Sequence, residues 1–297
     1  MRSGFVAVIG RSNAGKSTLI NVMVGEKVSI VSPKPQTTRD RILGVLTKED
    51  YQIVFVDTPG IYKAQNGLSE MMMRTADASA RDVDVILYVL DGHDRINPQD
   101  AELIEKYRKL QIPMIIAFTK TDIMPAEKIP EHLLQLSEMG VDLDIYPVSA
   151  RKGRGIAALE KALAALLPEG DKCFEEDIIS DKSERFMVAE IMREKILLKF
   201  EKEIPHGIAV SVNTFRLQEN DVYEISLDII CEKQNHKAIL IGKQGHAIKE
   251  VSSFARQDME KFLGKKVYLT TYVKVKEDWR NRPGLMKEFG YEEPKER

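Results

Sequence analysis

Residues 10–17, "GRSNAGKS", decide the fold class of this 297-residue chain. They match the pattern G-x-x-x-x-G-K-[ST], follow the apolar residues 5–9 and open a helical pattern. Glycines let backbone N–H groups close around phosphate oxygens, and a helix N-terminus adds positive potential, so this is more than a glycine-rich turn. The predicted nucleotide contacts here are Gly10, Arg11, Ser12, Asn13, Ala14, Gly15, Lys16, Ser17 and Thr18. Among these residues, Lys16 is expected to bridge the outer phosphates and Ser17 to ligate magnesium.

Short apolar runs alternate with helical patterns from residue 5 to about residue 167. Strands that are buried on both faces read as continuous apolar runs, so the alternation predicts an α/β fold with a doubly wound, mainly parallel sheet. An acidic stretch with Pro168 and Gly170 then interrupts the pattern, and we interpret it as a linker, although it could also be a solvated face. The predicted organisation is a P-loop nucleotide-binding domain over 1–170, a linker over 171–184 and a second, smaller α+β domain over 185–297.

The motif "DTPG", residues 57–60, follows a second buried run. Asp57 is placed to hold magnesium through water, and Gly60 is placed to offer its N–H to the terminal phosphate. Small signalling GTPases carry a water-orienting glutamine at the next position, where this chain has Ile61, whose side chain forms no hydrogen bond. Either the nucleotide is not hydrolysed or another group holds the water.

Two threonines lie in the polar stretch "KPQTTRDR", which reads as a loop between the two phosphate motifs. A threonine in such a loop can reach magnesium when the third phosphate is present. We expect Thr38 to be that ligand rather than Thr37, the alternative being a plain loop role for either residue.

The choice of base is predicted by the motifs "TKTD" and "VSARKG". Asp122 can accept hydrogen bonds from N1–H and the N2 amino group of guanine, whereas adenine would leave this carboxylate unpaired at considerable cost. The backbone N–H of Ala150 can bond the guanine O6. The predicted base-site residues are Thr119, Lys120, Asp122, Ser149, Ala150 and Arg151.

The second domain reads as helix, two strands, two helices and a strand, with G-x-x-G at residues 242–245 between the last two helices. Alone, this motif favours a helix-to-helix turn over a loop that clamps RNA, and only its context reverses that preference. Isoleucines 239, 241 and 248 are expected to anchor the two helices. Residues 233–276 hold 10 Lys and Arg against 3 Asp and Glu, an excess of seven that favours RNA over a merely solvated surface. The predicted RNA contacts are Ile241, Gly242, Lys243, Gln244, Gly245, Ile248 and Lys249.

The chain carries, in order, "GRSNAGKS", "PQTTRDR", "DTPGI", "TKTD", "VSARKG", "LLPEG", "IPHGIAV", "IGKQGHAIK" and "VKVKEDWR". With these motifs it closely resembles the Era family of bacterial GTPases over nearly its whole length. The resemblance implies a Ras-like GTPase domain with GTP, GDP and magnesium as ligands. It also implies a type II K-homology (KH) domain that binds the 3′ end of small-subunit (16S) ribosomal RNA during 30S assembly. Der-like proteins, with a second P-loop, and EngB-like proteins, which end near residue 170, fit less well.

Three residues depart from the usual family pattern: Thr119 replaces an asparagine, Arg151 a common lysine and Gln244 a frequent glycine. A threonine hydroxyl can still tie its loop to the P-loop, and Rho-type GTPases share the Thr-Lys-x-Asp form. Thr119 lowers the affinity that we expect for GTP but leaves the choice of base unchanged, and Gln244 leaves the predicted RNA clamp intact.

Asn13 offers one answer to the missing glutamine. In GTPases with a hydrophobic residue after the Asp-x-x-Gly glycine, a P-loop asparagine at this position can help to coordinate potassium beside the phosphates, and the chain resembles them in Asn13 and Ile61. Under this hypothesis Asn13 joins Lys16, Thr38 and Gly60 as a catalytic residue. The alternative is that Asn13 only satisfies its own turn.

The composition of the chain limits which partners and which cell compartment we expect for the protein. A formal charge of −2 with 43% apolar and 30% charged residues indicates two globular domains rather than a basic coat, and no DNA partner is expected. Cys173 and Cys231 form no C-x-x-C pair, which favours a reducing cytosol. The apolar start leaves no room for a leader peptide, and no apolar run reaches the roughly 18–20 residues of a membrane span. We therefore expect a cytoplasmic protein and leave transient contact with the inner membrane surface open.

We interpret the chain as a GTP-driven RNA-binding switch that hydrolysis resets. Two functions of other classes compete with this interpretation. One is a GTP-sensing regulator of the cell cycle or membrane surface whose second domain binds a protein. The other is an ATP-dependent RNA kinase, which Asp122 opposes because it matches guanine.

Overall fold

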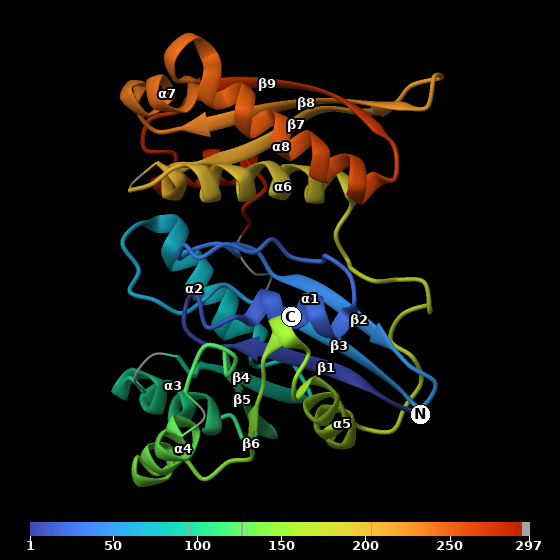
Figure 1. Ribbon diagram of the computed structural model, residues 1–297, viewed down its shortest axis with the longest axis vertical. Helices are drawn as coiled ribbons and strands as arrows, with labels where there is room; N and C mark the ends of the chain where they lie inside the picture. Colours follow the sequence, from blue (N-terminus) through green and yellow to red (C-terminus); the bar gives the residue numbers. More distant parts are fainter. Residues whose placement is uncertain (94–95, 126, 203, 293–297) are drawn as a thin grey trace.

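The computed structural model describes residues 1–93, 96–125, 127–202 and 204–292. A domain with a six-stranded sheet and a domain with a three-stranded sheet lie one above the other (Figure 1). Within the described part of the chain, no helix combines the length and apolar character that a membrane span requires.

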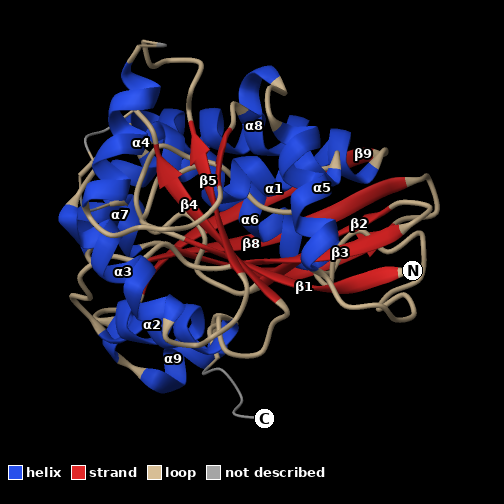
Figure 2. Ribbon diagram, turned by 90° about the horizontal axis from the view of Figure 1, so that it is seen from below, coloured by secondary structure: helices blue, strands red, loops and turns tan. Residues whose placement is uncertain are grey.

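The first sheet has the strand order β2-β3-β1-β4-β5-β6, and only the β2–β3 pair is antiparallel among its pairs. The strands are β1 (Arg2–Ile9), β2 (Ile42–Thr47), β3 (Tyr51–Asp57), β4 (Val85–Asp91), β5 (Met114–Thr119) and β6 (Ile145–Pro147). The helices around it (Figure 2) are α1 (Lys16–Val24), α2 (Gly67–Ser79), α3 (Pro98–Arg108), α4 (Lys128–Glu138), the 3₁₀ turn η1 (Ala150–Lys152) and α5 (Ile156–Leu166). The predicted doubly wound, mainly parallel sheet is confirmed.

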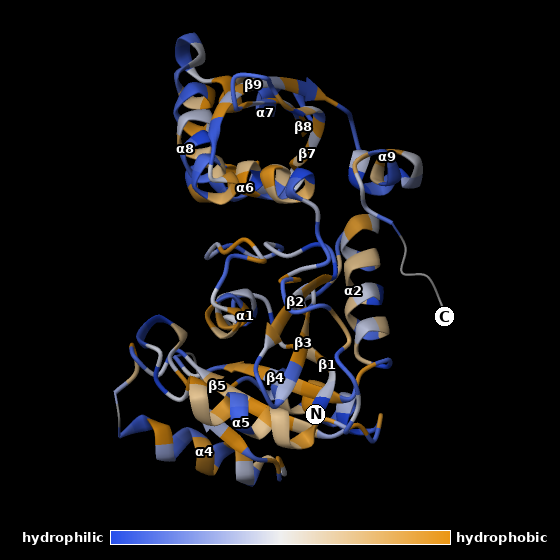
Figure 3. Cartoon of the chain, turned by 90° about the vertical axis from the view of Figure 1, so that its right-hand side faces the viewer, coloured by the Kyte–Doolittle hydropathy of each residue, from blue (hydrophilic) through white to orange (hydrophobic). Residues whose placement is uncertain are grey.

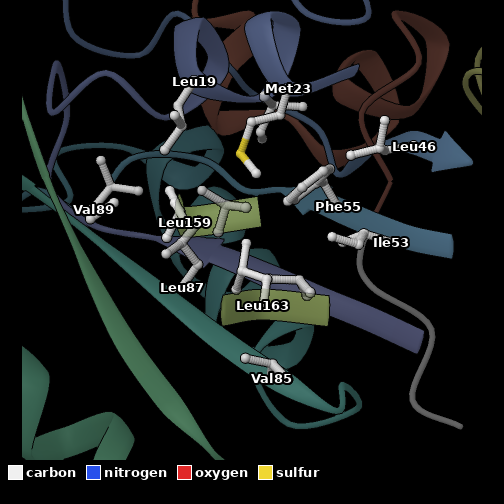
Figure 4. Packing of buried hydrophobic residues seen from close by; sticks show 14 of the residues in the cluster. Leu19, Met23, Leu46, Ile53, Phe55, Val85, Leu87, Val89, Leu159 and Leu163 are labelled. Carbon is white, nitrogen blue, oxygen red and sulfur yellow. The ribbon is translucent and has the colours of Figure 1, made fainter. Parts of the chain in front are cut away.

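Two apolar clusters, one on each face, hold this sheet. On one face Leu19 of α1 and Leu159 of α5 pack against Leu87 of β4 (Figure 4), and all three side chains are fully buried. On the other face Tyr107 of α3 and Leu136 of α4 are buried. Burial of both faces explains why the strands read as continuous apolar runs. The packing also places the turn between β1 and α1 at the carboxyl edge of the parallel strands.

Strand β2 is absent from the apolar runs that we recognised in the sequence. Gly44 interrupts it, and a Cβ at Gly44 would lie 3.1 Å from Ile20 and from Val28. The glycine therefore allows α1 to pack closely on a strand whose sequence looks broken. The interpreted linker follows the outer edge of β2, where Val45 N–H donates to the Ile179 carbonyl at 2.8 Å and Leu43 N–H to Asp181 Oδ1 at 2.8 Å.

The second sheet has the order β7-β8-β9, with β7 antiparallel and β9 parallel to β8. Its helices bury Ile191 of α6, Leu240 of α7 and Val251 of α8 against the sheet. The order of elements is the one that the sequence predicts. The elements are α6 (Glu184–Lys199), η2 (Pro205–Gly207), β7 (Ala209–Leu217), β8 (Val222–Cys231), α7 (Gln234–Ile241), η3 (Lys243–Gly245), α8 (His246–Leu263) and β9 (Lys266–Val275).

The chain after β9 connects the two domains through apolar contacts. It forms η4 (Trp279–Asn281) and α9 (Pro283–Glu288), and α9 lies beside the end of α2 (Figure 3). Trp279 is fully buried in a cluster with Met71 and Met72 of α2. We call residues 276–292 the C-terminal segment. No local pattern in the sequence indicates that Trp279 and these methionines meet.

Candidate functional site

The predicted phosphate loop lies between β1 and α1. Gly10 has φ 152° and Gly15 has φ 97°, and a Cβ at Gly10 would lie 2.3 Å from the Val89 carbonyl oxygen. The buried Lys16 ammonium donates to the Gly10 and Arg11 carbonyls, each at 3.0 Å. Burial lowers the pKa of Lys16 to about 8, and the Asp57 carboxylate acts against that shift. The loop therefore wraps around the Lys16 ammonium and places a positive charge at the start of α1, as a polyphosphate site requires.

The oxygens predicted to bind magnesium meet at one point. Ser17 Oγ donates to Asp57 Oδ2 at 2.8 Å, and Thr38 Oγ1 lies 2.9 Å from Ser17 Oγ and 3.4 Å from Asp57 Oδ2. Asp57 Oδ1 is buried without a hydrogen-bond partner among the described residues, and burial raises the pKa of this carboxyl. An unsatisfied carboxylate beside two hydroxyls fits a hard divalent cation that binds oxygen.

Thr37 and Thr38 point to different surroundings. Thr37 Oγ1 bonds the Lys34 carbonyl at 2.7 Å and lies 2.7 Å from Ser32 Oγ, within its own loop. Thr38, by contrast, is buried beside Ser17 and Asp57. This geometry favours Thr38 as the metal ligand.

The predicted base site forms at the ends of β5 and β6. Thr119 Oγ1 donates to the Ala14 carbonyl at 2.6 Å. The hydroxyl therefore ties this loop to the P-loop, the role expected for it in place of the usual asparagine. Ser149 Oγ donates to Asp122 Oδ1 at 2.7 Å and holds the pKa of that carboxyl below its usual value. Lys120 forms an ion pair with Asp91. These contacts orient the Asp122 carboxylate before any base arrives.

One cavity of about 760 Å³ joins the phosphate and base sites, and it is large enough for a nucleotide. Gly10, Asp57 and Ser149 lie behind its wall and support residues that line it. The predicted residues that line it are Arg11, Ser12, Asn13, Ala14, Gly15, Lys16, Ser17, Thr18, Thr38, Gly60, Thr119, Lys120, Asp122, Ala150 and Arg151.

The cavity has one wall that the sequence did not predict. Leu198 of α6 lines it from the second domain, and residues 30–34 line it from the threonine loop. Helix α6 also fixes that loop, because Glu194 accepts from Lys27 Nζ at 2.7 Å and from Val31 N–H at 3.0 Å. No local motif marks Leu198, since its role depends on how the domains pack.

Ile61 has a position that accounts for its apolar side chain. Its N–H donates to the Gly10 carbonyl at 3.1 Å, and its own carbonyl accepts from Ser12 N–H at 3.3 Å. The side chain packs against the buried cluster that includes Ile9. A Cβ at the neighbouring Gly60 would lie 2.7 Å from Ser12 Cα. Ile61 thus holds the segment after Gly60 on the P-loop.

Asn13 faces the threonine loop. It has φ 66°, and its Nδ2 donates to the Pro33 carbonyl at 2.7 Å across the mouth of the cavity. The side chain therefore bridges two segments that border the phosphate site. The alternative to ion binding is that Asn13 only satisfies its own turn. The bond to Pro33 reaches another loop, so the role of Asn13 is not purely local.

The G-x-x-G motif forms the turn between α7 and α8. Gly242 has φ 71°, Gly245 φ 77° and Gln244 φ 52°, so three of its four residues adopt positive φ. A Cβ at Gly242 would lie 2.7 Å from Ala247 Cβ, which explains the glycine there. Lys243 is exposed at the tip. Close backbone approach beside a lysine suits a nucleic-acid strand.

Side chains beside this turn differ in part from the prediction. Ile241 and Ile248 are half-buried, whereas Ile239 is 50% exposed and does not anchor its helix, a role that the buried Leu240 takes instead. Lys243 and Lys249 form no ion pair within the described part of the chain, while Lys274, farther away on β9, pairs with Asp228. Two exposed lysines without an ion pair among the described residues therefore lie at the turn and in the first part of α8.

The chain matches two protein-family models. Residues 5–120 match the 50S ribosome-binding GTPase family, and residues 203–280 match the KH domain family. Full-length relatives carry both parts. The chain is 44% identical over 291 residues to GTPase Era of Clostridium kluyveri, covering 98% of this chain and 99% of the relative. It is 45% identical over 294 residues to GTPase Era of Clostridium botulinum, covering 99% of each.

Two solved structures have the same two-domain arrangement. One is an Aquifex aeolicus Era variant bound to GDP and AlF4−, with a TM-score of 0.94, 39% identity and coverage of 98% of this chain and 99% of that one. The other is Era in complex with MgGDPNP and nucleotides 1506–1542 of 16S ribosomal RNA, with a TM-score of 0.94, 40% identity and the same coverage. Since the identity extends over both domains and the fold agrees along the full length, this chain belongs to the Era family of GTPases.

Proposed function

We propose that this protein is a GTP-driven switch that binds the 3′ end of 16S ribosomal RNA through its KH domain and acts in assembly of the 30S subunit. The observation that carries the proposal is that α6 of the RNA-binding domain lines the nucleotide cavity through Leu198. A shared wall lets occupancy of one site change the affinity of the other, and such coupling is reciprocal. The relative bound to 16S ribosomal RNA and a GTP analogue supports this choice of ligands.

The proposed reaction is attack of water on the terminal phosphate of GTP. Ser17, Thr38 and Asp57 would hold magnesium, which would neutralise charge that develops between the outer phosphates. Lys16 would stabilise the same charge, and the Gly60 N–H would donate to the terminal phosphate. In our hypothesis Asn13 would help to hold a potassium ion.

The proposed organisation is a GTPase domain over 1–170, a linker over 171–184 and a type II KH domain with its tail over 185–297. The end of α5 at Leu166 and the start of α6 at Glu184 support it. We propose a cytoplasmic location. Contact with the inner face of the cell membrane is a separate proposal, which co-flotation with anionic vesicles tests.

The RNA part of the proposal is tested by Gly245→Asp. This position has φ 77°, which aspartate tolerates better than most residues, and a Cβ there meets no atom within 4 Å. The carboxylate should repel the phosphate chain and weaken binding of a 16S 3′-end oligonucleotide by about 10-fold or more. Gly242→Asp is less suitable, because its Cβ would collide with Ala247. Fluorescence anisotropy of labelled RNA measures the effect.

Gly264→Asp is the matched control for this experiment. Gly264 also has positive φ, at 66°, and open space, but it caps the opposite end of the 18-residue helix α8. This variant should bind RNA as tightly as the unmodified protein, and both variants should retain GTP binding. Equal RNA affinity of Gly245→Asp and the unmodified protein would show that the glycine turn is only a turn.

A further inference from the structure

Arg39, the residue after the proposed metal ligand Thr38, is buried in the other domain. Only 1% of it is exposed. Its Nη1 donates to the Ile208 carbonyl at 2.6 Å and to Tyr291 Oη at 3.1 Å, and its Nη2 donates to the His206 carbonyl at 2.9 Å. Its guanidinium carbon lies 5.9 Å from the Trp279 ring centre and 5.7 Å from that of Tyr291. We call Trp279, Tyr291 and the two carbonyls the arginine cage.

Contacts among its own members and with the second domain hold the arginine cage in place. Trp279 Nε1 donates to the Gly207 carbonyl at 2.9 Å, and the Trp279 and Tyr291 rings stack with centres 5.7 Å apart. A guanidinium that is removed from water needs such carbonyl and aromatic partners, and a lysine cannot reproduce their planar, multiple contacts. The position of Arg39 therefore depends on the C-terminal segment.

Thr38 is held on both sides by the second domain. On one side Arg193 of α6 donates to the Thr37 carbonyl, and on the other side Arg39 enters the cage. Between these two anchors Thr38 Oγ1 stays 2.9 Å from Ser17 Oγ. Arg39 itself does not line the nucleotide cavity. It can therefore affect the metal site only through the backbone of Thr38.

The C-terminal segment contacts the other nucleotide-sensing region as well. Asn281 Oδ1 accepts from the Gly67 N–H at 2.9 Å, at the start of the helix that follows the Asp-x-x-Gly motif. Met286 and Tyr291 share a buried cluster with Leu68. A displacement of this segment would therefore disturb the surroundings of both motifs at once.

We propose that Arg39 is a positioning residue for GTP hydrolysis, which fixes Thr38 at the metal site only while the C-terminal segment forms the arginine cage. The proposal rests on the GTP-switch function proposed above and names the contact that carries the switch between domains. Loss of the terminal phosphate frees Thr38 and with it Arg39, so the cage responds to the nucleotide. By reciprocity, ligands that displace the C-terminal segment change the hydrolysis rate.

Trp279 is the only tryptophan in the chain, so its fluorescence reports directly on the cage. Exchange of GDP for GDPNP with magnesium should change the Trp279 emission of the full-length protein. Arg39→Ala should abolish this change, and calorimetry should show that the variant still binds GDPNP. Arg41→Ala is the matched control, because Arg41 is exposed two residues away, and it should retain the change.

Hydrolysis gives a second readout that a purely structural role would not produce. Arg39→Ala should lower kcat by about 10-fold to 100-fold with little change in KM, because a misplaced Thr38 stabilises the transition state less. Tyr291→Phe, which removes one acceptor and keeps the ring, should lower kcat less and in the same direction. This variant also tests the idea if Arg39→Ala fails to fold.

Two results would overturn the proposal. One is Trp279 emission that is identical with GDP and GDPNP in protein that binds both. The other is a kcat of folded Arg39→Ala or Tyr291→Phe equal to that of the unmodified protein. Failure of the protein to bind GDPNP would instead contradict the proposed GTP switch, and failure to bind RNA would leave the role of Arg39 standing.

Discussion

Asp122→Asn is expected to weaken GTP binding by about 100-fold or more and to create affinity for xanthosine triphosphate. The carboxylate can accept from both N1–H and the N2 amino group of guanine, whereas an amide accepts once and donates once. Xanthine has a carbonyl in place of the amino group, so it matches the amide. Calorimetry with the two nucleotides measures the exchange of specificity.

The variant should remain folded, because the introduced amide can still accept the Ser149 hydroxyl through its oxygen, as the Asp122 carboxylate does at 2.7 Å. Its melting temperature without nucleotide is therefore the control. Two results would contradict the assignment of the base: ATP binding as tight as GTP binding by the unmodified protein, or unchanged GTP affinity in the variant.

GTP hydrolysis should be markedly faster in potassium than in sodium at equal ionic strength, and Asn13→Gly should remove the difference. Phosphoryl transfer depends mainly on positioning and on positive charge near the outer phosphates, and the Ile61 side chain can neither orient the attacking water nor supply charge. Loss of one such stabiliser typically costs about 100-fold to 1,000-fold in rate. Phosphate release at saturating GTP in the two salts measures the effect.

Glycine is the better replacement here because Asn13 has φ 66°, where alanine would add backbone strain. Asn13→Asp is the companion variant, since it keeps an oxygen ligand and should retain part of the preference for potassium. GTP affinity should change little in both variants. Equal hydrolysis rates of the unmodified protein in the two salts would contradict potassium binding at the site. The missing positive charge would then have to come from a bound partner.

Most of the fold could be predicted because its evidence is local. The P-loop motif requires a strand before it and a helix after it, and the apolar runs at β1, β3, β4 and β5 reflect burial on both sheet faces. The predicted Era family membership and the predicted fold class are confirmed by full-length relatives. Strand β2 was missed because Gly44, required by the close packing of α1, hides its apolar character.

The candidate site could be predicted less completely. Motifs indicate residue types, and the structure brings Ser17, Thr38 and Asp57 within hydrogen-bonding distance from three separate segments. The individual roles of these residues stay predictions. Ile239 was assigned to the wrong environment because a helical apolar pattern cannot tell which isoleucine faces the sheet and which faces solvent.

By itself the sequence determined the P-loop architecture, the preference for guanine and the KH-type second domain, because each depends on residues close together in the chain. Only the tertiary structure decided that Leu198 closes the nucleotide cavity and that Arg39 lies between Trp279 and Tyr291. These contacts join residues up to 252 positions apart, and their partners are ordinary apolar or basic side chains without a local motif. Their energy comes from burial of complementary surfaces between domains, which no short stretch of sequence records.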